Sequence, residues 1–307
     1  MKPVDLKKGD KVAIIAPSGR VYDFELDGML NRIKNWGLTP VLGKHLFCDY
    51  NNGYHYAGTS QQRSEDFQWA IDNDEIKAIW CARGGYGAVQ IIDLIQWDTF
   101  LQNPKWIIGY SDITAFHNHL NNKGIETLHG LTIKQLNVDY TPETFDTLKC
   151  ILFGQKLNYT IPNHPLNREG KAIGKLVGGN LSIIYSLLGS KSSIQGDDLL
   201  LFIEDWNENW YHLDRMLTNV KRNGLFKQIK GLIVGSFTKM DIKEENPNFH
   251  ANFDLTSNEL IHKFIENYDF PVCFQFPAGH IGDNRALILG SQVELNISNT
   301  NATLEFS

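Results

Sequence analysis

Lys105-Trp-Ile-Ile-Gly-Tyr-Ser-Asp-Ile-Thr-Ala-Phe-His-Asn-His-Leu-Asn-Asn-Lys-Gly124 is the stretch that decides the fold. Its apolar run, 106–108, is typical of a buried parallel strand. Apolar residues then recur at helical intervals, and Gly124 predicts the end of that helix. A serine between strand and helix, here Ser111, exposes its hydroxyl at the carboxyl end of a sheet, and the amide of Asp112 points the same way. The stretch therefore predicts either a nucleophile with half an oxyanion hole or a plain N-cap.

Strands alternate with helices on the N-terminal side of this stretch. Apolar runs predict strands at 11–16, closed by a Pro-Ser-Gly turn at 17–19, and at 38–42 and 76–82. Amphipathic spacing predicts helices at 24–36, 60–72 and 88–95. This alternation implies right-handed crossovers and a parallel sheet, whose ligands gather at the carboxyl ends of the strands. Both Arg83-Gly-Gly-Tyr-Gly87 and Gly109-Tyr-Ser-Asp112 fall at such ends.

The second half of the chain predicts another unit. Residues 156–171 are rich in Pro and Asn and are interpreted as a linker. Residues 174–182 predict a strand and a glycine turn that lead into a helix. Further strands are predicted at 198–204, 231–236, 271–276 and 286–289, and a helix at 214–223. Alternation with period two at 293–297 and 302–306 predicts an antiparallel finish. We expect an α/β fold: an N-terminal domain (1–155) with a mostly parallel sheet flanked by helices, and a smaller C-terminal α/β-β domain (172–307).

Composition restricts the class of protein. The chain has 307 residues, 42% hydrophobic and 21% charged, with a net charge of −6 and no Lys/Arg run, which argues against nucleic acid or an anionic membrane as partner. No apolar run approaches the length of a membrane span, and the first ten residues lack a signal-peptide core. Four isolated cysteines are typical of buried residues in a reducing compartment. We expect a cytoplasmic protein.

A serine nucleophile needs a hydrogen-bonded base that a third group orients. Of ten histidines, His117 lies about 9 Å beyond Ser111 along the helix, and we expect it and His119 to be solvated. His280 follows a strand in a glycine-rich loop, where an exposed ring can be aimed. His129, before Gly130, is the alternative base.

Two further features are candidates for the same chemistry. Glu204 ends an apolar strand and could orient the base, with Asp205 as the alternative. The loop Arg83–Gly87 lacks a full phosphate-binding pattern, so it indicates a phosphate cradle only weakly. Its backbone N–H groups could instead supply a second oxyanion donor, and Arg83 could bind a carboxylate, although a plain tight turn fits equally well.

Short motifs taken together resemble one family, the LD-carboxypeptidases among the serine peptidases, which include the murein tetrapeptide carboxypeptidases. They occur in order across residues 10–290: Ile15-Ala-Pro-Ser-Gly19, Ala82-Arg-Gly-Gly-Tyr-Gly-Ala88, Ile108-Gly-Tyr-Ser-Asp112, His129-Gly130, Gly178-Gly-Asn-Leu181, Ile203-Glu-Asp205, Tyr211-x-x-Asp-Arg-Met-Leu217 and Gly279-His-Ile-Gly-Asp-Asn284. Several collinear motifs are far more specific than any single one.

The resemblance implies a serine carboxypeptidase that releases the terminal D-alanine of murein tetrapeptides by hydrolysing an L,D-amide bond, in peptidoglycan recycling. Its active site would lie at the domain interface. The implied residues are the nucleophile Ser111 from the first domain, Glu204 and His280 from the second, the oxyanion-hole amides of Asp112 and Gly85 (or its neighbour in the glycine pair), and the substrate-binding Arg83, Gly84 and Tyr86. The resemblance also implies a homodimer with no metal and no organic cofactor.

Two other functions stay open at this point. A related amidase could act on a peptidyl-nucleotide antibiotic, with the aromatic segment Trp206–Tyr211 stacking on a flat group. Alternatively, the loop Arg83–Gly87 could belong to a nucleotide-phosphate-binding module in which Ser111 is only a helix cap.

Overall fold

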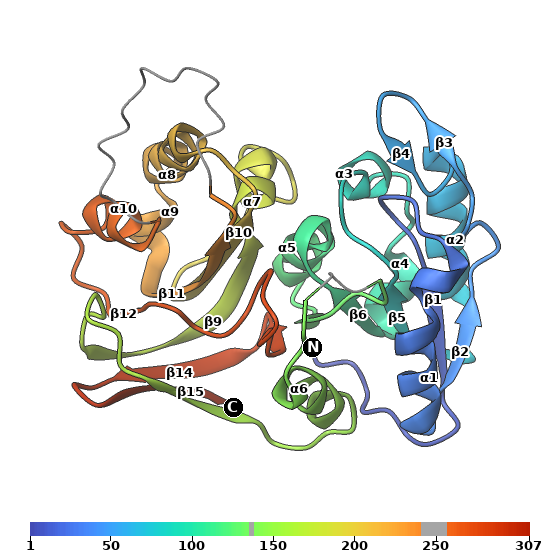
Figure 1. Cartoon of the computed structure of the whole chain (residues 1–307), viewed down its shortest axis with the longest axis horizontal. Coiled ribbons are helices and arrows are strands. Elements are labelled where there is room, and N and C mark those ends of the chain that lie inside the picture. The colour runs from blue at the N-terminus through green and yellow to red at the C-terminus, as the bar shows by residue number, and fades with distance from the viewer. Residues whose placement is uncertain (135–137, 241–256) are drawn as a thin grey trace.

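The computed structural model describes residues 1–134, 138–240 and 257–307, and each half of the chain contains one large sheet (Figure 1). The N-terminal sheet has the order β13-β7-β6-β5-β1-β2. Its strands are β1 (Lys11–Ile15), β2 (Thr39–Leu42), β5 (Ile76–Cys81), β6 (Trp106–Gly109), β7 (Thr127–His129) and β13 (Leu287–Leu289). All neighbours are parallel except β13, which is antiparallel to β7. The mostly parallel N-terminal sheet is therefore confirmed.

Helices cover both faces of this sheet, as a parallel sheet requires. Val12 and Ile14 pack in the core under α1, whereas Ala13 and Ile15 pack in the core under α2. The helices and short elements are η1 (Asp23–Glu25), α1 (Asp27–Asn35), the hairpin β3 (Tyr50–Asn51) and β4 (His55–Tyr56), α2 (Ser60–Asp72), α3 (Ala88–Ile91), α4 (Asp98–Gln102), η2 (Ser111–Ile113), α5 (Thr114–Asn122) and α6 (Pro142–Leu152).

The C-terminal sheet has the order β12-β11-β10-β9-β14-β15-β8. Its strands are β8 (Asn158–Pro162), β9 (Gly170–Asn180), β10 (Leu199–Trp206), β11 (Ile229–Thr238), β12 (Val272–Cys273), β14 (Gln292–Ile297) and β15 (Asn301–Phe306). β9 to β12 are parallel, and β14, β15 and β8 pair antiparallel, which confirms the finish predicted from period-two alternation.

Helices of the C-terminal half lie on one face of its sheet (Figure 1). They are α7 (Leu181–Leu187), α8 (Trp210–Asn223), α9 (Leu225–Gln228) and α10 (Ser257–Phe264). Within the described ranges, no helix of either half combines the length and apolar character needed to cross a bilayer.

Two strands depart from the division predicted for the chain. The segment predicted as a linker, 156–171, contains β8, whose buried Tyr159 and Ile161 alternate with exposed residues and face the C-terminal core. The Pro and Asn residues around them obscured this short period-two pattern. β13 leaves the C-terminal half and completes the N-terminal sheet beside β7. The N-terminal sheet therefore includes one strand from the C-terminal half of the chain.

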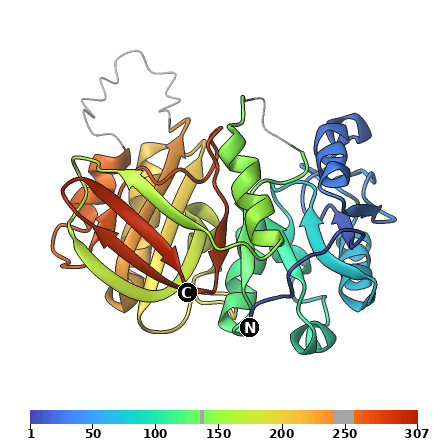
Figure 2. The same ribbon diagram turned by 90° about the horizontal axis from the view of Figure 1, so that it is seen from below.

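The two halves meet at an interface, called the seam below, where α5 and α6 of the first half contact the second half (Figure 2). On the α5 side, the backbone N–H of Asn180 donates to Thr114 Oγ1 over 3.0 Å. A Cβ on Gly179 would lie 2.5 Å from the same oxygen, so only glycine permits this approach. On the α6 side, Thr144 Oγ1 donates to the carbonyl of Gly282 over 2.7 Å. Both contacts hold segments that lead into the site described below.

Thr114→Val should destabilise the protein, because the isosteric change removes the oxygen that accepts from the buried Asn180 amide. We expect the free energy of unfolding to fall by about 1–3 kcal/mol. Thr218→Val, in the half-buried position of α8 whose hydroxyl makes only a long contact to Asp214, is the matched control. Urea unfolding measures both; equal effects would contradict a special role for the seam bond.

Candidate active site

Ser111 lies on a sharp turn between β6 and α5. Its φ of 61° is in the left-handed region, which is uncommon for a residue with a side chain. A Cβ on Gly84 would lie 3.1 Å from Ser111 Oγ and 3.3 Å from the backbone nitrogen of Asp112. Because Gly84 has no side chain, the Arg83–Gly87 loop can approach both the hydroxyl and that amide.

The Asp112 side chain holds this turn to its neighbours. Its Oδ2 accepts from Ser18 Oγ over 2.5 Å and from the backbone N–H of Ala88 over 2.8 Å. The carboxyl is fully buried, and burial raises its pKa to about 6 despite these hydrogen bonds. Asp112 thereby ties the nucleophile turn to the end of the Arg83–Gly87 loop.

His280 and Glu204 form a buried pair from the other half of the chain. His280 Nδ1 donates to Glu204 Oε2 over 2.7 Å, and the Glu204 side chain is fully buried. Burial of the ring opposes its charge, but the nearby Glu204 carboxylate outweighs this and raises the pKa of His280 above its ordinary 6.5. The ring also contacts Tyr110 at 4.7 Å between centroids and stacks on Trp206 at 5.7 Å.

Strand geometry explains why Glu204, and not Asp205, contacts the histidine. Along β10, Leu199, Leu201 and Ile203 face the helices, whereas Leu200 and Phe202 face the opposite core. Since successive side chains alternate, Glu204 shares the face of Phe202. Asp205 points to α7, where its carboxylate accepts from the Asn180 side chain and from the backbone N–H of Ser182.

A cavity of about 160 Å³ at the junction of the two halves contains both groups. Ser111 and His280 line it without a hydrogen bond between them. The other lining residues are Arg83, Gly84, Gly85, Tyr110, Thr132, Lys134 and Trp206. The structure thus brings the predicted serine and histidine to one cavity, with Glu204 directly behind the ring.

The predicted substrate-binding residues separate into two groups. Arg83, Gly84 and Gly85 line the cavity, and Arg83 Nη1 donates to the carbonyl of Arg20. Tyr86 does not line it. Its ring packs near Tyr54 and Tyr56 and borders a neighbouring cleft of about 610 Å³ between the two halves. The chain bends at Gly85, which has a φ of 99°, and Tyr86 lies outside the cavity that Ser111 lines.

The prediction that His117 and His119 are solvated was wrong. His117 is fully buried and contacts the carbonyl of Gly109, and His119 is buried against Ser192 Oγ. α5 is covered from both sides because it lies at the seam, so its buried face is wider than that of a helix on a single sheet. His129 is also fully buried, and burial lowers its pKa well below 6.5. It does not line the cavity, which favours His280 as the base.

Sequence reasoning missed Tyr110, Thr132 and Lys134. Lys134 reaches the cavity because its backbone N–H donates to the carbonyl of Ala82 over 2.7 Å, which places it beside the end of β5. A contact between residues so far apart in the sequence cannot be predicted from a short motif. Proximity to the His129-Gly130 motif, at the carboxyl end of β7, was the signal that could have identified Thr132 and Lys134.

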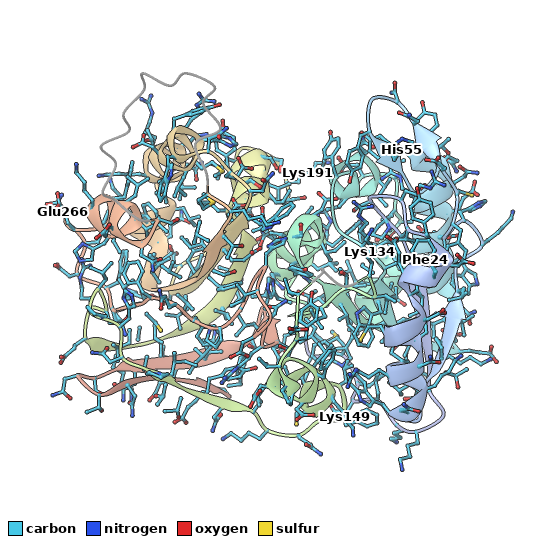
Figure 3. All side chains as sticks on the ribbon, in the orientation of Figure 1. Phe24, His55, Lys134, Lys149, Lys191 and Glu266 are labelled. Atoms are coloured by element: carbon cyan, nitrogen blue, oxygen red, sulfur yellow. The ribbon has the colours of Figure 1, made fainter. Side chains whose placement is uncertain are left out.

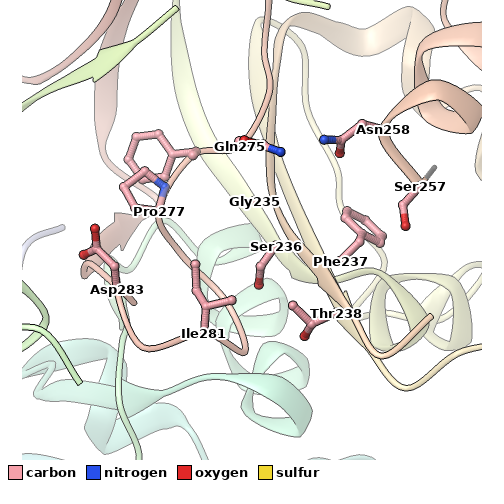
Figure 4. A pocket seen from close by; sticks show the side chains of 11 residues that line it. Gly235, Ser236, Phe237, Thr238, Ser257, Asn258, Gln275, Pro277, Ile281 and Asp283 are labelled. Carbon is pink, nitrogen blue, oxygen red and sulfur yellow. The ribbon is translucent and has the colours of Figure 1, made fainter. Parts of the chain in front are cut away.

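A larger cavity, of about 480 Å³, lies at the carboxyl end of β11 (Figure 4). The segment that carries His280 forms one wall through Pro277 and Ile281, and Ser236 and Thr238 are on β11. It contains neither Ser111 nor His280. This cavity and the 610 Å³ cleft are both larger than the cavity that Ser111 and His280 line, so size does not identify the site.

Fold and site define a class: an α/β protein of two sheets with a serine, a histidine and a buried carboxylate meeting at the seam. Family models described as the LD-carboxypeptidase N-terminal and C-terminal domains match residues 12–130 and 173–295. A Bacillus subtilis protein named "Probable murein peptide carboxypeptidase" is 33% identical over 310 residues, covering 99% of this chain and 94% of its own. The chain belongs to the LD-carboxypeptidase family of serine peptidases.

Other relatives extend this comparison. The Escherichia coli protein named "Microcin C7 self-immunity protein MccF" is 24% identical over 285 residues, covering 82% of this chain and 80% of its own. The crystal structure of a muramoyltetrapeptide carboxypeptidase from Oxalobacter formigenes superposes with a TM-score of 0.85 at 22% identity, over 97% of this chain and 98% of that one. At this identity the structural likeness shows the shared fold.

Gly279→Ala should disrupt the site more than it disrupts the fold. Gly279 has a φ of 117°, and a Cβ there would lie 2.8 Å from Glu204 Oε2 and 2.4 Å from Ser236 Oγ. We expect turnover to fall by about 10²-fold through displacement of His280. Gly224→Ala, at a φ of 93° with open space around it, also places a side chain at a positive φ and is the control. Similar turnover in the two variants, measured on a hydrolysed peptide, would refute this.

Proposed function

We propose that the protein is a serine carboxypeptidase that hydrolyses the L,D-amide bond of murein tetrapeptides and releases the terminal D-alanine, in peptidoglycan recycling. One observation carries the proposal: Ser111, on a turn with a positive φ, and His280 line the same cavity. His280 is hydrogen-bonded to the fully buried Glu204. The names of the Bacillus and Oxalobacter relatives support the substrate class. The cytoplasmic location and the homodimer stay predictions.

Acylation would begin at Ser111. His280 Nε2 accepts the hydroxyl proton as Oγ forms a bond to the carbonyl carbon of the L-residue. The imidazolium then donates that proton to the amine of D-alanine as the C–N bond breaks, which leaves an ester on Ser111. Glu204 holds the proton on Nδ1 and stabilises the imidazolium through the 2.7 Å hydrogen bond.

Deacylation would repeat the sequence with water. His280 accepts a proton from water, the hydroxide oxygen adds to the ester carbon, and the proton returns to Ser111 Oγ as the ester breaks. In both steps the oxyanion would be stabilised by the amides of Asp112 and Gly85, each worth about 10²- to 10³-fold in rate. Gly84 contributes by its missing side chain, since a Cβ there would crowd Ser111.

A second candidate, cleavage of a peptidyl-nucleotide antibiotic, is favoured by one observation. Trp206 lines the cavity and keeps 37% of its surface exposed, so it could contact a flat group. Its stacking on His280 already occupies part of the ring. Comparison of kcat/KM on a muropeptide and on an aminoacyl-nucleotide separates the two functions. Labelling of Ser111 by a fluorophosphonate would exclude a module that only binds nucleotide phosphates.

Incubation with a defined L,D-tetrapeptide should yield the tripeptide and one D-alanine by mass spectrometry. Ser111→Ala and His280→Ala should each lower kcat by about 10⁶-fold, because the two groups act as one unit. Ser298→Ala, in the β14–β15 turn, is the matched control. We also expect activity to survive EDTA. Retention of most activity in Ser111→Ala would contradict the proposed nucleophile.

Activity should decline at acidic pH with an apparent pKa above 6.5. His280 must be neutral to accept the serine proton, and its pKa is raised by Glu204, so kcat/KM should fall as pH drops through that value. Glu204→Gln removes the carboxylate, which should shift this limb to lower pH and lower the plateau by about 10⁴-fold. A limb that does not move in Glu204→Gln would show that another group titrates.

A further inference from the structure

Lys134 lines the cavity, yet the hydrolysis proposed above gives it no role. We propose that Lys134, together with Arg83, binds the free α-carboxylate of the terminal D-amino acid. Glu25 forms an ion pair with Lys134 until substrate enters. This inference rests on the proposed function and makes the Lys134–Glu25 pair the determinant of specificity for a chain terminus.

The position of Lys134 is fixed by the fold. The backbone N–H groups of Ile133 and Lys134 donate to the carbonyls of Cys81 and Ala82, over 3.2 and 2.7 Å. These two bonds hold the segment at the carboxyl end of β5, and Lys134 lies next to the residue that precedes Arg83. Thr132 Oγ1 donates to the Lys134 carbonyl over 2.8 Å and stabilises the bend. Both cationic side chains then extend to the cavity that Ser111 lines.

Glu25 neutralises only one of these two cations. Its Oε1 accepts from Lys134 Nζ over 2.5 Å, and its Oε2 accepts from the backbone N–H of Tyr22 over 2.9 Å. Partial burial opposes ionisation, but Lys134, the Tyr22 amide and Arg83 together lower the pKa of Glu25 below its ordinary value. Figure 3 labels Lys134 and Phe24, the residue before Glu25. The cluster of Arg83, Lys134 and Glu25 thus has one excess positive charge.

Both cations have hydrogen-bond donors that the described part of the chain does not use. An ammonium group has three N–H donors, and Glu25 accepts one from Lys134. A guanidinium has five, and the Arg20 carbonyl accepts one from Arg83. A carboxylate entering the cavity could therefore bind both groups while Lys134 turns away from Glu25. The Lys134–Glu25 pair remains partly solvated, with 26% and 17% of the side chains exposed, so exchange of one carboxylate for another is feasible.

This arrangement gives a physical reason for cleavage at a chain end. A peptide that continues beyond the D-residue has a neutral amide where the terminal substrate has a carboxylate. The amide would leave the excess charge of the cluster unpaired, whereas the carboxylate neutralises it through charge-assisted hydrogen bonds. The cluster would therefore select for the terminus by charge.

Calorimetric binding to full-length Ser111→Ala tests this, with N-acetyl-L-lysyl-D-alanine and its C-terminal amide as the two probes. Adding Lys134→Met should reduce the preference for the carboxylate over the amide by about 10- to 100-fold. Lys134→Arg should retain the preference, and Glu25→Gln should retain or increase it. Lys11→Met, which breaks a similar Lys–Glu pair at the amino end of β1, is the matched control.

The outcomes separate this inference from the proposed function. An unchanged preference in folded Lys134→Met, or equal loss on both probes, overturns the role of Lys134, even if the wild-type enzyme releases D-alanine. Loss of preference in Glu25→Gln overturns the role of Glu25. If neither probe binds and the wild-type enzyme hydrolyses no L,D-peptide, both the proposed function and this inference fail. Circular dichroism of each variant shows that it is folded.

Discussion

The hydrogen bond between His280 and Glu204 is the interaction on which the site depends. A carboxylate at the end of an apolar strand, fully buried, would be costly without a partner, and the imidazole supplies one. The pairing requires a glycine at 279, since any side chain there would collide with the carboxylate. It also requires the alternation of β10 to direct Glu204, and not Asp205, towards the seam.

Glycine permits close backbone contacts elsewhere around the site as well. Close backbone approaches occur where glycine removes a side chain: Gly84 against Ser111, Gly179 against Thr114, and Gly279 against Glu204. Each one brings a segment of one loop or half to within hydrogen-bonding range of another. Asp112 then locks the nucleophile turn to Ser18 and Ala88 through its buried carboxylate. The cavity is therefore built from backbone proximity as much as from side chains.

Much of this architecture could be predicted from local pattern. The strand-helix alternation before residue 124, the period-two finish and the turn at Ser111 are all short-range signals, and the structure has elements at those places. The sequence pattern did not predict features that depend on contacts between residues distant in the sequence. The burial of His117 and His119 depends on the C-terminal half covering α5. The position of Lys134 depends on backbone hydrogen bonds from residues 133 and 134 to the end of β5. The sequence shows that Glu204 and Asp205 lie on opposite faces of a strand. It does not show which of the two faces is directed towards the N-terminal half.

The strand shared between the halves has a consequence for biosynthesis. Until residues 287–289 leave the ribosome, β7 is an unpaired edge next to an otherwise complete sheet. Such an edge can pair with other chains, so a nascent or truncated chain that lacks β13 would be prone to aggregate. Because β8 pairs with β15, both sheets are completed only once residues 287–306 have been synthesised. Neither sheet is therefore complete before the other half of its strand pairing, in residues 287–306, is available.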